Sequence, residues 1–132
     1  ALVITVVPLL FGVPGAVSPL RYAVAVIAST AAFLALGTVL SAVIPNPKAA
    51  SGVGTAVAAT QWFAAGMWYP RALFPEWLTT LTNLMPGGAA AQLMGDAMTG
   101  AGSATELGTG VLVCLVWAVV GVVVALRTFR WE

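Results

Sequence analysis

Long apolar runs without a single charged residue dominate this chain. Residues 22–44, 49–69 and 107–126 each contain no Asp, Glu, Lys or Arg. A helix of about 20 mostly apolar residues crosses the roughly 30 Å of hydrocarbon in a bilayer. The pattern therefore predicts three membrane-spanning helices at these positions.

A fourth apolar run opens the chain at residues 1–17, although Pro8 and Pro14 interrupt it. We interpret it as the remainder of a transmembrane helix that is kinked at Pro8 and ends near Pro14, because neighbouring helices can satisfy the carbonyls that a proline frees. A chain that begins at Ala1 inside an apolar run looks like a part of a longer protein. The expected organisation is one transmembrane domain over residues 1–132 with four spans.

The link between the second and third spans is very short, and it contains Pro45 and Pro47. Each proline fixes φ and lacks an amide hydrogen, so the pair ends the preceding helix and forces a reversal. We therefore expect these two spans to form an antiparallel hairpin. Small residues at four-residue spacing, among them Gly37 and Ser41, would permit close contact between them.

Residues 70–106, called the hairpin segment below, are too polar to span a membrane and too apolar for a solvated loop. Pro75 suits the start of a helix, and Glu76 suits its positive end. The apolar side chains that follow, beginning with Trp77, recur at three- and four-residue spacing and share one face. The sequence Pro86-Gly87-Gly88 is expected to break this helix before a second one at about residues 89–98.

Two arrangements of this segment fit the pattern. It can dip into the outer leaflet as a re-entrant helical hairpin, which requires that its irregular backbone be buried in protein or line a water-filled cavity. It can also lie flat on the membrane surface as an amphipathic helix. The fold class that we predict is an all-α antiparallel transmembrane bundle with an extracytoplasmic re-entrant or interfacial hairpin.

Composition supports the membrane assignment and removes most kinds of chemistry. The chain is 61% hydrophobic and 7% charged, with a net charge of +1, no His and a single Cys. So few charges cannot coat a soluble globule, and so small a net charge does not attract nucleic acid. Without His or a second Cys, we expect no catalytic residue, no metal site and no disulfide.

Basic residues in the short connections predict the orientation of the chain. With four spans, Lys48, Arg127 and Arg130 share one side of the membrane, and Arg21 and Arg71 share the other. The bias of three against two favours a cytoplasmic C-terminus, which places the hairpin segment outside.

Together, these residues resemble a known family, the membrane subunits of ABC-2-type ABC transporters. Four ordered motifs carry the resemblance, and they are Leu36-Gly37-Thr38-Val39-Leu40, Ala65-Gly66-Met67-Trp68-Tyr69-Pro70, Leu73-Phe74-Pro75-Glu76-Trp77-Leu78 and Leu84-Met85-Pro86. The resemblance covers essentially the whole chain, as spans three to six of a six-span subunit.

The resemblance implies a multi-pass permease in the plasma membrane, and the Ala-, Val- and Gly-rich composition points to a GC-rich bacterium. It implies a cytoplasmic ATP-binding cassette subunit as partner, which would carry ATP and Mg²⁺, and a second permease subunit in a homodimer or heterodimer. It also implies that the hairpin segment forms the outer lid of a translocation path. The candidate lid residues are Gly66, Pro70, Pro75, Glu76, Trp77, Pro86, Gly87 and Gly88.

Gln61 is the most polar side chain within a predicted span, and Ala65 and Trp68 share its helical face. This face could line an export path for amphiphilic molecules. Alternatively, the Gln61 amide makes a hydrogen bond between helices, worth about 0.6–2 kcal/mol.

The function that we expect is the permease subunit of an ATP-driven exporter, which itself catalyses no reaction. Proton-driven exchange normally needs an ionisable residue within the membrane, and none of the predicted spans has one. The alternatives are a membrane scaffold that recruits an extracytoplasmic partner, and a small channel with carbonyls of Pro86-Gly87-Gly88 at its constriction.

Overall fold

The computed structural model describes residue 10, residues 17–44 and residues 46–128. This part of the chain is all-helical and contains no strand, which confirms the predicted α class. The elements are α2 (Pro19–Val43), α3 (Pro47–Ala64), the 3-10 turn η1 (Arg71–Leu73), α4 (Glu76–Asn83), α5 (Pro86–Thr99) and α6 (Ala104–Thr128). The expected first span, with its bends at Pro8 and Pro14, lies outside the described residues apart from Leu10 and Val17.

Two helices, α2 and α6, are each 25 residues long and apolar enough to cross a membrane. Helix α2 begins three residues before the predicted boundary, because Ser18 caps it and Pro19 occupies its first turn. Helix α6 also begins early. Ser103 and Glu106 form a capping box there, in which the Ser103 amide donates to the Glu106 carboxylate at 2.8 Å and the Glu106 amide donates to Ser103 Oγ at 3.2 Å.

Helix α3 is shorter than the predicted span, with 18 residues that end at Ala64. Asn46 caps its start by accepting a hydrogen bond from the Lys48 amide at 3.0 Å. Its last predicted turn is absent because Gly66 adopts a φ of 80°, a left-handed conformation that turns the chain out of the helix. The spanning role of α3 stays a prediction.

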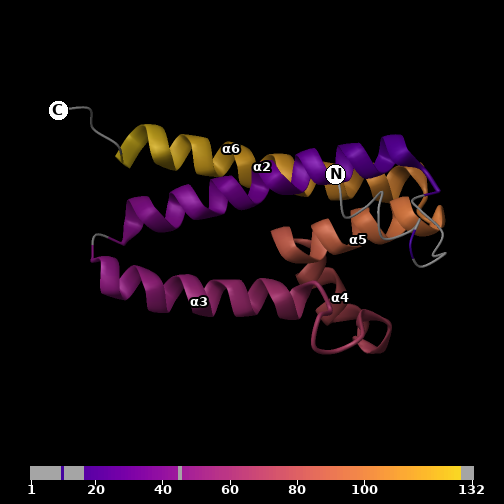
Figure 1. Ribbon diagram of the computed structural model, residues 1–132, viewed down its shortest axis with the longest axis horizontal. Coiled ribbons are helices and arrows are strands. Elements are labelled where there is room, and N and C mark those ends of the chain that lie inside the picture. The colour runs from indigo at the N-terminus through magenta and orange to yellow at the C-terminus, as the bar shows by residue number, and fades with distance from the viewer. Residues whose placement is uncertain (1–9, 11–16, 45, 129–132) are drawn as a thin grey trace.

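The long helices lie side by side, with α2 and α6 running in one direction and α3 in the other (Figure 1). The most extensive helix packing is between α2 and α6, and the next is between α2 and α5. Helix α5 lies beside the first halves of α2 and α6, at what we call the hairpin end of the molecule (Figure 1). The opposite end, where α2 turns into α3, is the link end.

The core lies where α2, α5 and α6 meet. It is built mostly from small residues around one leucine, and its buried members are Ala25, Ala28, Ala32, Ala89, Leu93 and Cys114. Further along the same interface, a Cβ atom added at Gly121 of α6 would lie 2.3 Å from the Cβ atom of Ala35 in α2. Small residues permit this close approach.

The close contact that we expected between α2 and α3 is not formed by the residues that predicted it. A Cβ atom at Gly37 would meet nothing within 4 Å, and Ser41 is exposed. Both hydroxyls of this part of α2 instead bond within the helix, since Thr38 donates to the Ala35 carbonyl and Ser41 to the Thr38 carbonyl. The predicted close contact of α2 with α3 through these small residues is therefore wrong, and the close packing of α2 is on α6.

The hairpin segment contains two helices, as predicted, but the break between them falls earlier. Helix α4 ends at Asn83, and Pro86, Gly87 and Gly88 form the first turn of α5. Proline is well suited to the first position of a helix because that amide has no partner within the helix. The Pro-Gly-Gly sequence thus opens the second helix and does not separate the two.

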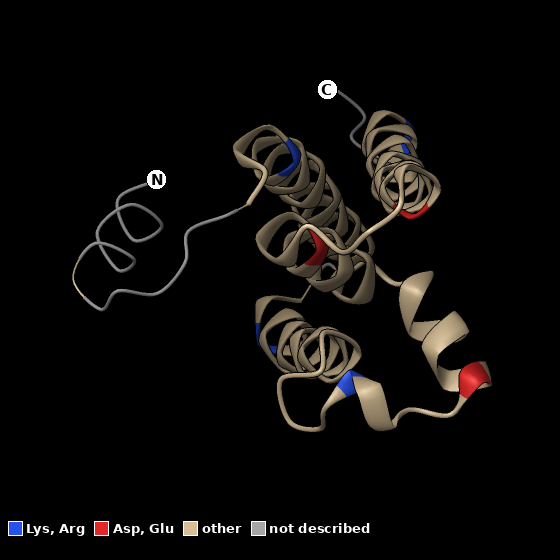
Figure 2. Ribbon diagram, turned by 90° about the vertical axis from the view of Figure 1, so that its right-hand side faces the viewer, with Lys and Arg blue, Asp and Glu red and all other residues tan. Residues whose placement is uncertain are grey.

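Charged residues lie near the ends of helices and in connections, whereas the long helices are otherwise uncharged (Figure 2). The outward side of α6 instead exposes large apolar side chains along most of its length. These are Leu112, Leu115, Val116, Val119, Val120, Val122, Val123 and Leu126. Such a surface is suited to lipid or to another apolar helix, in agreement with a membrane location.

Candidate functional site

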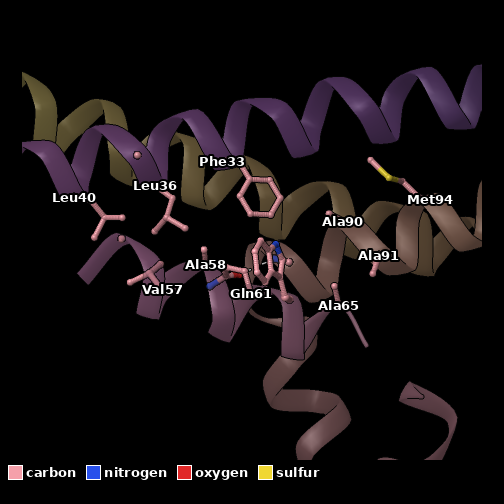
Figure 3. A pocket seen from close by; sticks show the side chains of 14 residues that line it. Phe33, Leu36, Leu40, Val57, Ala58, Gln61, Ala65, Ala90, Ala91 and Met94 are labelled. Atoms are coloured by element: carbon pink, nitrogen blue, oxygen red, sulfur yellow. Dashed lines mark hydrogen bonds between the residues drawn. The ribbon is translucent and has the colours of Figure 1, made fainter. Parts of the chain in front are cut away.

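A groove of about 540 Å³ lies between α2, α3 and α5 (Figure 3). Helix α2 provides one wall and helix α3 the other, and the first half of α5 closes the hairpin end. The lining residues are Phe33, Leu36, Gly37, Leu40, Gly54, Val57, Ala58, Gln61, Trp62, Ala65, Gly87, Ala90, Ala91 and Met94. No member of this set is charged.

Part of the α3 face that was predicted to line a path, the face of Gln61, Ala65 and Trp68, does line the groove. Gln61 and Ala65 line it, and Gln61 is labelled at its centre in Figure 3. Trp68 does not line it, because α3 has already ended and this side chain is 63% exposed beyond the turn at Gly66. Phe33 and Met94, which the sequence reasoning did not select, add an aromatic ring from α2 and a thioether from α5.

The amide of Gln61 joins α3 to α5. Its side-chain oxygen accepts a hydrogen bond from the Gly87 amide at 2.8 Å. The first amides of a helix have no partner within that helix, and Met85, which precedes α5, has no side-chain oxygen to offer. Gln61 therefore caps α5 from another helix. The hydrogen bond between helices is present, whereas contact with a transported molecule stays a prediction.

Two of the candidate glycines occupy positions where a side chain has no room. A Cβ atom at Gly87 would lie 2.5 Å from the backbone oxygen of Gln61, and one at Gly88 would lie 1.9 Å from the backbone oxygen of Thr82. Glycine therefore allows the start of α5 to touch both α3 and α4 through the backbone.

The corner between α4 and α5 is also attached to α6, since the indole Nε1 of Trp117 donates to the Leu84 carbonyl at 2.9 Å. The other candidate lid residues differ in burial. Pro86 is buried at the start of α5, whereas Pro70, Pro75, Glu76 and Trp77 are exposed around η1 and α4.

The far end of α5 is held by the start of α2. The amides of Val17 and Ser18 donate to the carbonyls of Met98 and Ala97 at 3.4 and 3.2 Å. One guanidinium nitrogen of Arg21 donates to the Gly102 carbonyl at 2.8 Å. Sequence reasoning missed these contacts, because nothing in a local pattern pairs residues that lie so far apart in the chain.

Asp96 lies in this same region, near the end of α5. Burial raises the pKa of its carboxyl group, and the neighbouring Glu106 raises it further, while Arg21 and Arg71 act in the opposite direction. Its Oδ2 atom is buried and has no hydrogen-bond partner among the described residues. Within residues 17–44 and 46–128, no three His, Cys, Asp or Glu side chains are placed to hold a metal ion.

A comparison with known protein families finds a match over most of the chain. The model of the family described as ABC-2 family transporter protein matches residues 1–127. No curated protein and no solved structure matches significantly. The family model covers nearly the entire length and the same apolar helices that form the groove, so this chain belongs to the ABC-2 family of transporter proteins and is a membrane component of that transport system.

Proposed function

We propose that this chain forms the substrate path of an ATP-driven exporter, with the groove between α2, α3 and α5 as the place where the cargo binds. The observation that carries the proposal is the groove itself, which is large, uncharged and lined by Phe33, Trp62 and Met94 around a single amide at Gln61. Mostly apolar pockets with a few placed polar groups are typical of small-molecule sites.

The energy for transport comes from a partner in this proposal. The residues that line the groove include no Asp, Glu, Lys or Arg, and proton-coupled carriers use such residues within the membrane. A cytoplasmic ATP-binding cassette subunit would hold ATP and Mg²⁺, and this chain would bind neither. A second permease subunit, identical or related, would complete the path.

We place the link end in the cytoplasm and the hairpin end outside, in the plasma membrane of a bacterium. Lys48 and Arg127 belong to the link end, where the C-terminal end of α6 also lies (Figure 1). Cytoplasmic connections are enriched in Lys and Arg. The same placement makes the hairpin segment extracytoplasmic.

The hairpin segment acts as the outer lid and dips into the bilayer as a re-entrant hairpin. Support comes from α5, in which seven of 14 residues are buried and which packs against both α2 and α6. A helix lying flat on the membrane would bury one face in lipid headgroups and would not contribute to a protein core. Gly87, Ala90, Ala91 and Met94 make α5 the floor of the groove at this end.

Groove-blocking variants of the full-length subunit, assembled with its ATPase in inside-out vesicles, test the proposal. Uptake of a panel of uncharged fluorescent amphiphiles is measured with ATP, and again with ATP plus a protonophore. Ala58→Trp, which fills the groove, should abolish uptake, whereas Thr60→Trp, on the exposed side of the same helix, should not.

Each outcome of this experiment bears on the proposal. ATP-dependent uptake that survives the protonophore and is lost only in Ala58→Trp supports it. Equal uptake by both variants overturns the groove as the path. Ion flux through the subunit without the ATPase would identify a channel, and an assembled complex without ATP-dependent uptake of any probe would favour a scaffold.

A further inference from the structure

Arg71 is the one charged side chain that connects the end of α3 with both helices of the hairpin segment among the described residues. It is the first residue of η1, and it is half-buried. One terminal nitrogen of its guanidinium donates to the Gly88 carbonyl at 2.8 Å, and the other donates to Asn83 Oδ1. A single side chain therefore holds the last residue of α4 and the first turn of α5.

The aliphatic part of the Arg71 side chain passes close to the backbone of Gly66. A Cβ atom at Gly66 would lie 2.5 Å from Arg71 Cγ and 3.2 Å from Arg71 Cδ. Because Gly66 also has a φ of 80°, a residue with a side chain there would be strained and would displace Arg71. The glycine that ends α3 thus leaves the space through which Arg71 reaches α5.

The two acceptors need the particular shape of a guanidinium. Arg presents several donors in a rigid planar fork, whereas Lys presents one compact ammonium group on a flexible stem. A lysine at position 71 could reach Gly88 or Asn83 but could not hold both in a fixed relation. Hydrogen bonds from a charged donor are also stronger than those between neutral groups.

These contacts lie beside the bond from Gly87 to Gln61, so the first turn of α5 is held at two adjacent residues. Gln61 reaches it from the body of α3, and Arg71 reaches it from the turn after α3. The link between α3 and α5 is otherwise sparse, since α5 packs mainly against α2 and α6. These two side chains therefore join the end of α3 to α5, beside the backbone contact between Gly87 and Gln61.

We propose that Arg71 is a positioning residue that fixes the start of α5 to the end of α3, so that the hairpin segment follows α3 when the groove opens and closes. This inference rests on the proposed function, in which the hairpin segment is the outer lid. Arg71 itself lies outside the set of residues that line the groove. It acts on transport through the placement of α5.

The test compares Arg71→Met and Arg71→Lys with Arg21→Met in the full-length subunit assembled with its ATPase. Methionine keeps an apolar stem and removes both donors. Arg21 is the matched control, because it also bonds a backbone carbonyl at the hairpin end but belongs to α2. Hydrogen exchange of the amides of residues 87–89 reports directly on the joint between Arg71 and the start of α5, and uptake of the uncharged amphiphiles reports its effect on transport.

We expect Arg71→Met to speed exchange of these amides by about tenfold or more, since the substitution removes charge-assisted hydrogen bonds. The maximal uptake rate should fall several-fold with little change in the half-saturating probe concentration, because the groove keeps its lining. Arg71→Lys should recover part of both effects. Arg21→Met should leave exchange at residues 87–89 unchanged.

Unchanged exchange at residues 87–89 in Arg71→Met would overturn the inference. Faster exchange with normal uptake would uphold the joint and overturn the lid function of the hairpin segment, which separates the two proposals. If Arg71→Met does not assemble, Asn83→Ala removes one of the two acceptors, and it should produce a smaller increase in exchange at the same amides. No increase in that variant would count against the joint.

Discussion

The side-chain oxygen of Gln61 accepts a hydrogen bond from the Gly87 amide, with 2.8 Å between oxygen and nitrogen. The main polar group that lines the groove therefore also joins α3 to α5. A residue that lines a path and also caps a helix cannot be assigned a role from one alanine variant. Two substitutions that treat the bond differently can separate the roles.

Gln61→Ala should lower the free energy of unfolding by about 1 kcal/mol, the usual worth of a hydrogen bond between membrane helices. Gln61→Glu keeps an oxygen acceptor and places a negative charge at the start of α5, so it should retain most of the stability. If cargo contacts this residue, Gln61→Glu should reduce uptake of uncharged amphiphiles relative to cationic ones. Thermal unfolding and uptake by equal amounts of assembled complex measure the two effects, and unaltered preference in both variants would leave only the structural role.

The glycines of α5 provide a prediction with an internal control. Gly87→Ala and Gly88→Ala each force an atom against a backbone oxygen, which should cost about 1–3 kcal/mol and lower transport. Gly95→Ala lies in the same helix with nothing within 4 Å of its added carbon. It should be neutral or stabilise by up to about 1 kcal/mol through helix propensity. Equal destabilisation in all three variants would refute a positional role.

Larger changes at the same turn test the lid more severely. We expect Gly87→Leu or Pro86→Ala to lower transport while insertion into the membrane and binding of the ATPase stay nearly unchanged. Both residues are buried at the start of α5, far from the link end, which the proposed orientation places on the cytoplasmic side with the ATPase. Transport normalised to assembled complex is the measurement. Normal transport in both variants would make the hairpin segment a passive surface element.

The sequence predicted the elements that depend on local pattern. Uncharged apolar runs located α2 and α6 to within three residues at each end, because length and composition alone decide whether a helix can span a bilayer. The capping box of Ser103 and Glu106 has a recognisable local spacing, although the predicted span begins only at residue 107. The start of α6 at Ala104 is therefore a feature that the local sequence specifies.

Other features depend on partners far away in the chain and could not be read locally. Gly87 and Gly88 are poor helix formers, so a local rule breaks the helix there. In the structure they open α5, because contact with Gln61 and Thr82 leaves no space for a side chain. The same holds for Gly37, whose spacing indicated close packing although the close packing of α2 is on α6.

The contact between α2 and α6 yields a second glycine comparison. Gly121→Ala would place its new carbon 2.3 Å from the Cβ atom of Ala35, so the helices must separate or shift. We expect the free energy of unfolding of the purified subunit to fall by about 1–3 kcal/mol, measured by thermal unfolding. Gly37→Ala, which meets nothing within 4 Å, is the control and should not destabilise. If Gly121→Ala leaves the free energy of unfolding unchanged, close contact between Gly121 and Ala35 does not contribute to the packing of α2 on α6.

The orientation can be tested with single cysteines in a background that lacks Cys114. Cysteine at Lys48 or Arg127, both exposed at the link end, should be protected from an impermeant reagent added outside. Cysteine at Ser103, exposed at the hairpin end, should be labelled. Thr82 is a poor reporter although it lies in the hairpin segment, because it is only 2% exposed. Labelling at position 127 from outside would reverse the assignment.

Asp96 should make the stability of the protein depend on pH. Burial raises the pKa of its carboxyl group in the folded state above the ordinary value of 3.8, which holds in the unfolded state. At pH values between the unfolded-state and folded-state pKa, the folded state therefore binds more protons than the unfolded state. Stability therefore falls as the pH rises through this interval, and the full decrease remains at neutral pH. Asp96→Asn stays uncharged throughout, and it should be more stable than the original protein at about pH 7.5, with the difference shrinking as the pH approaches about 4.

The control is Glu76→Gln, which removes a carboxylate that is exposed at the start of α4. Thermal unfolding of the assembled complex across this pH range should show a pH-dependent gain for Asp96→Asn that Glu76→Gln does not share. A gain of the same size at all pH values would mean that the amide side chain is preferred at this position for its shape or hydrogen bonding. Lower stability of Asp96→Asn at neutral pH would show that attraction from Arg21 and Arg71 outweighs the burial of Asp96.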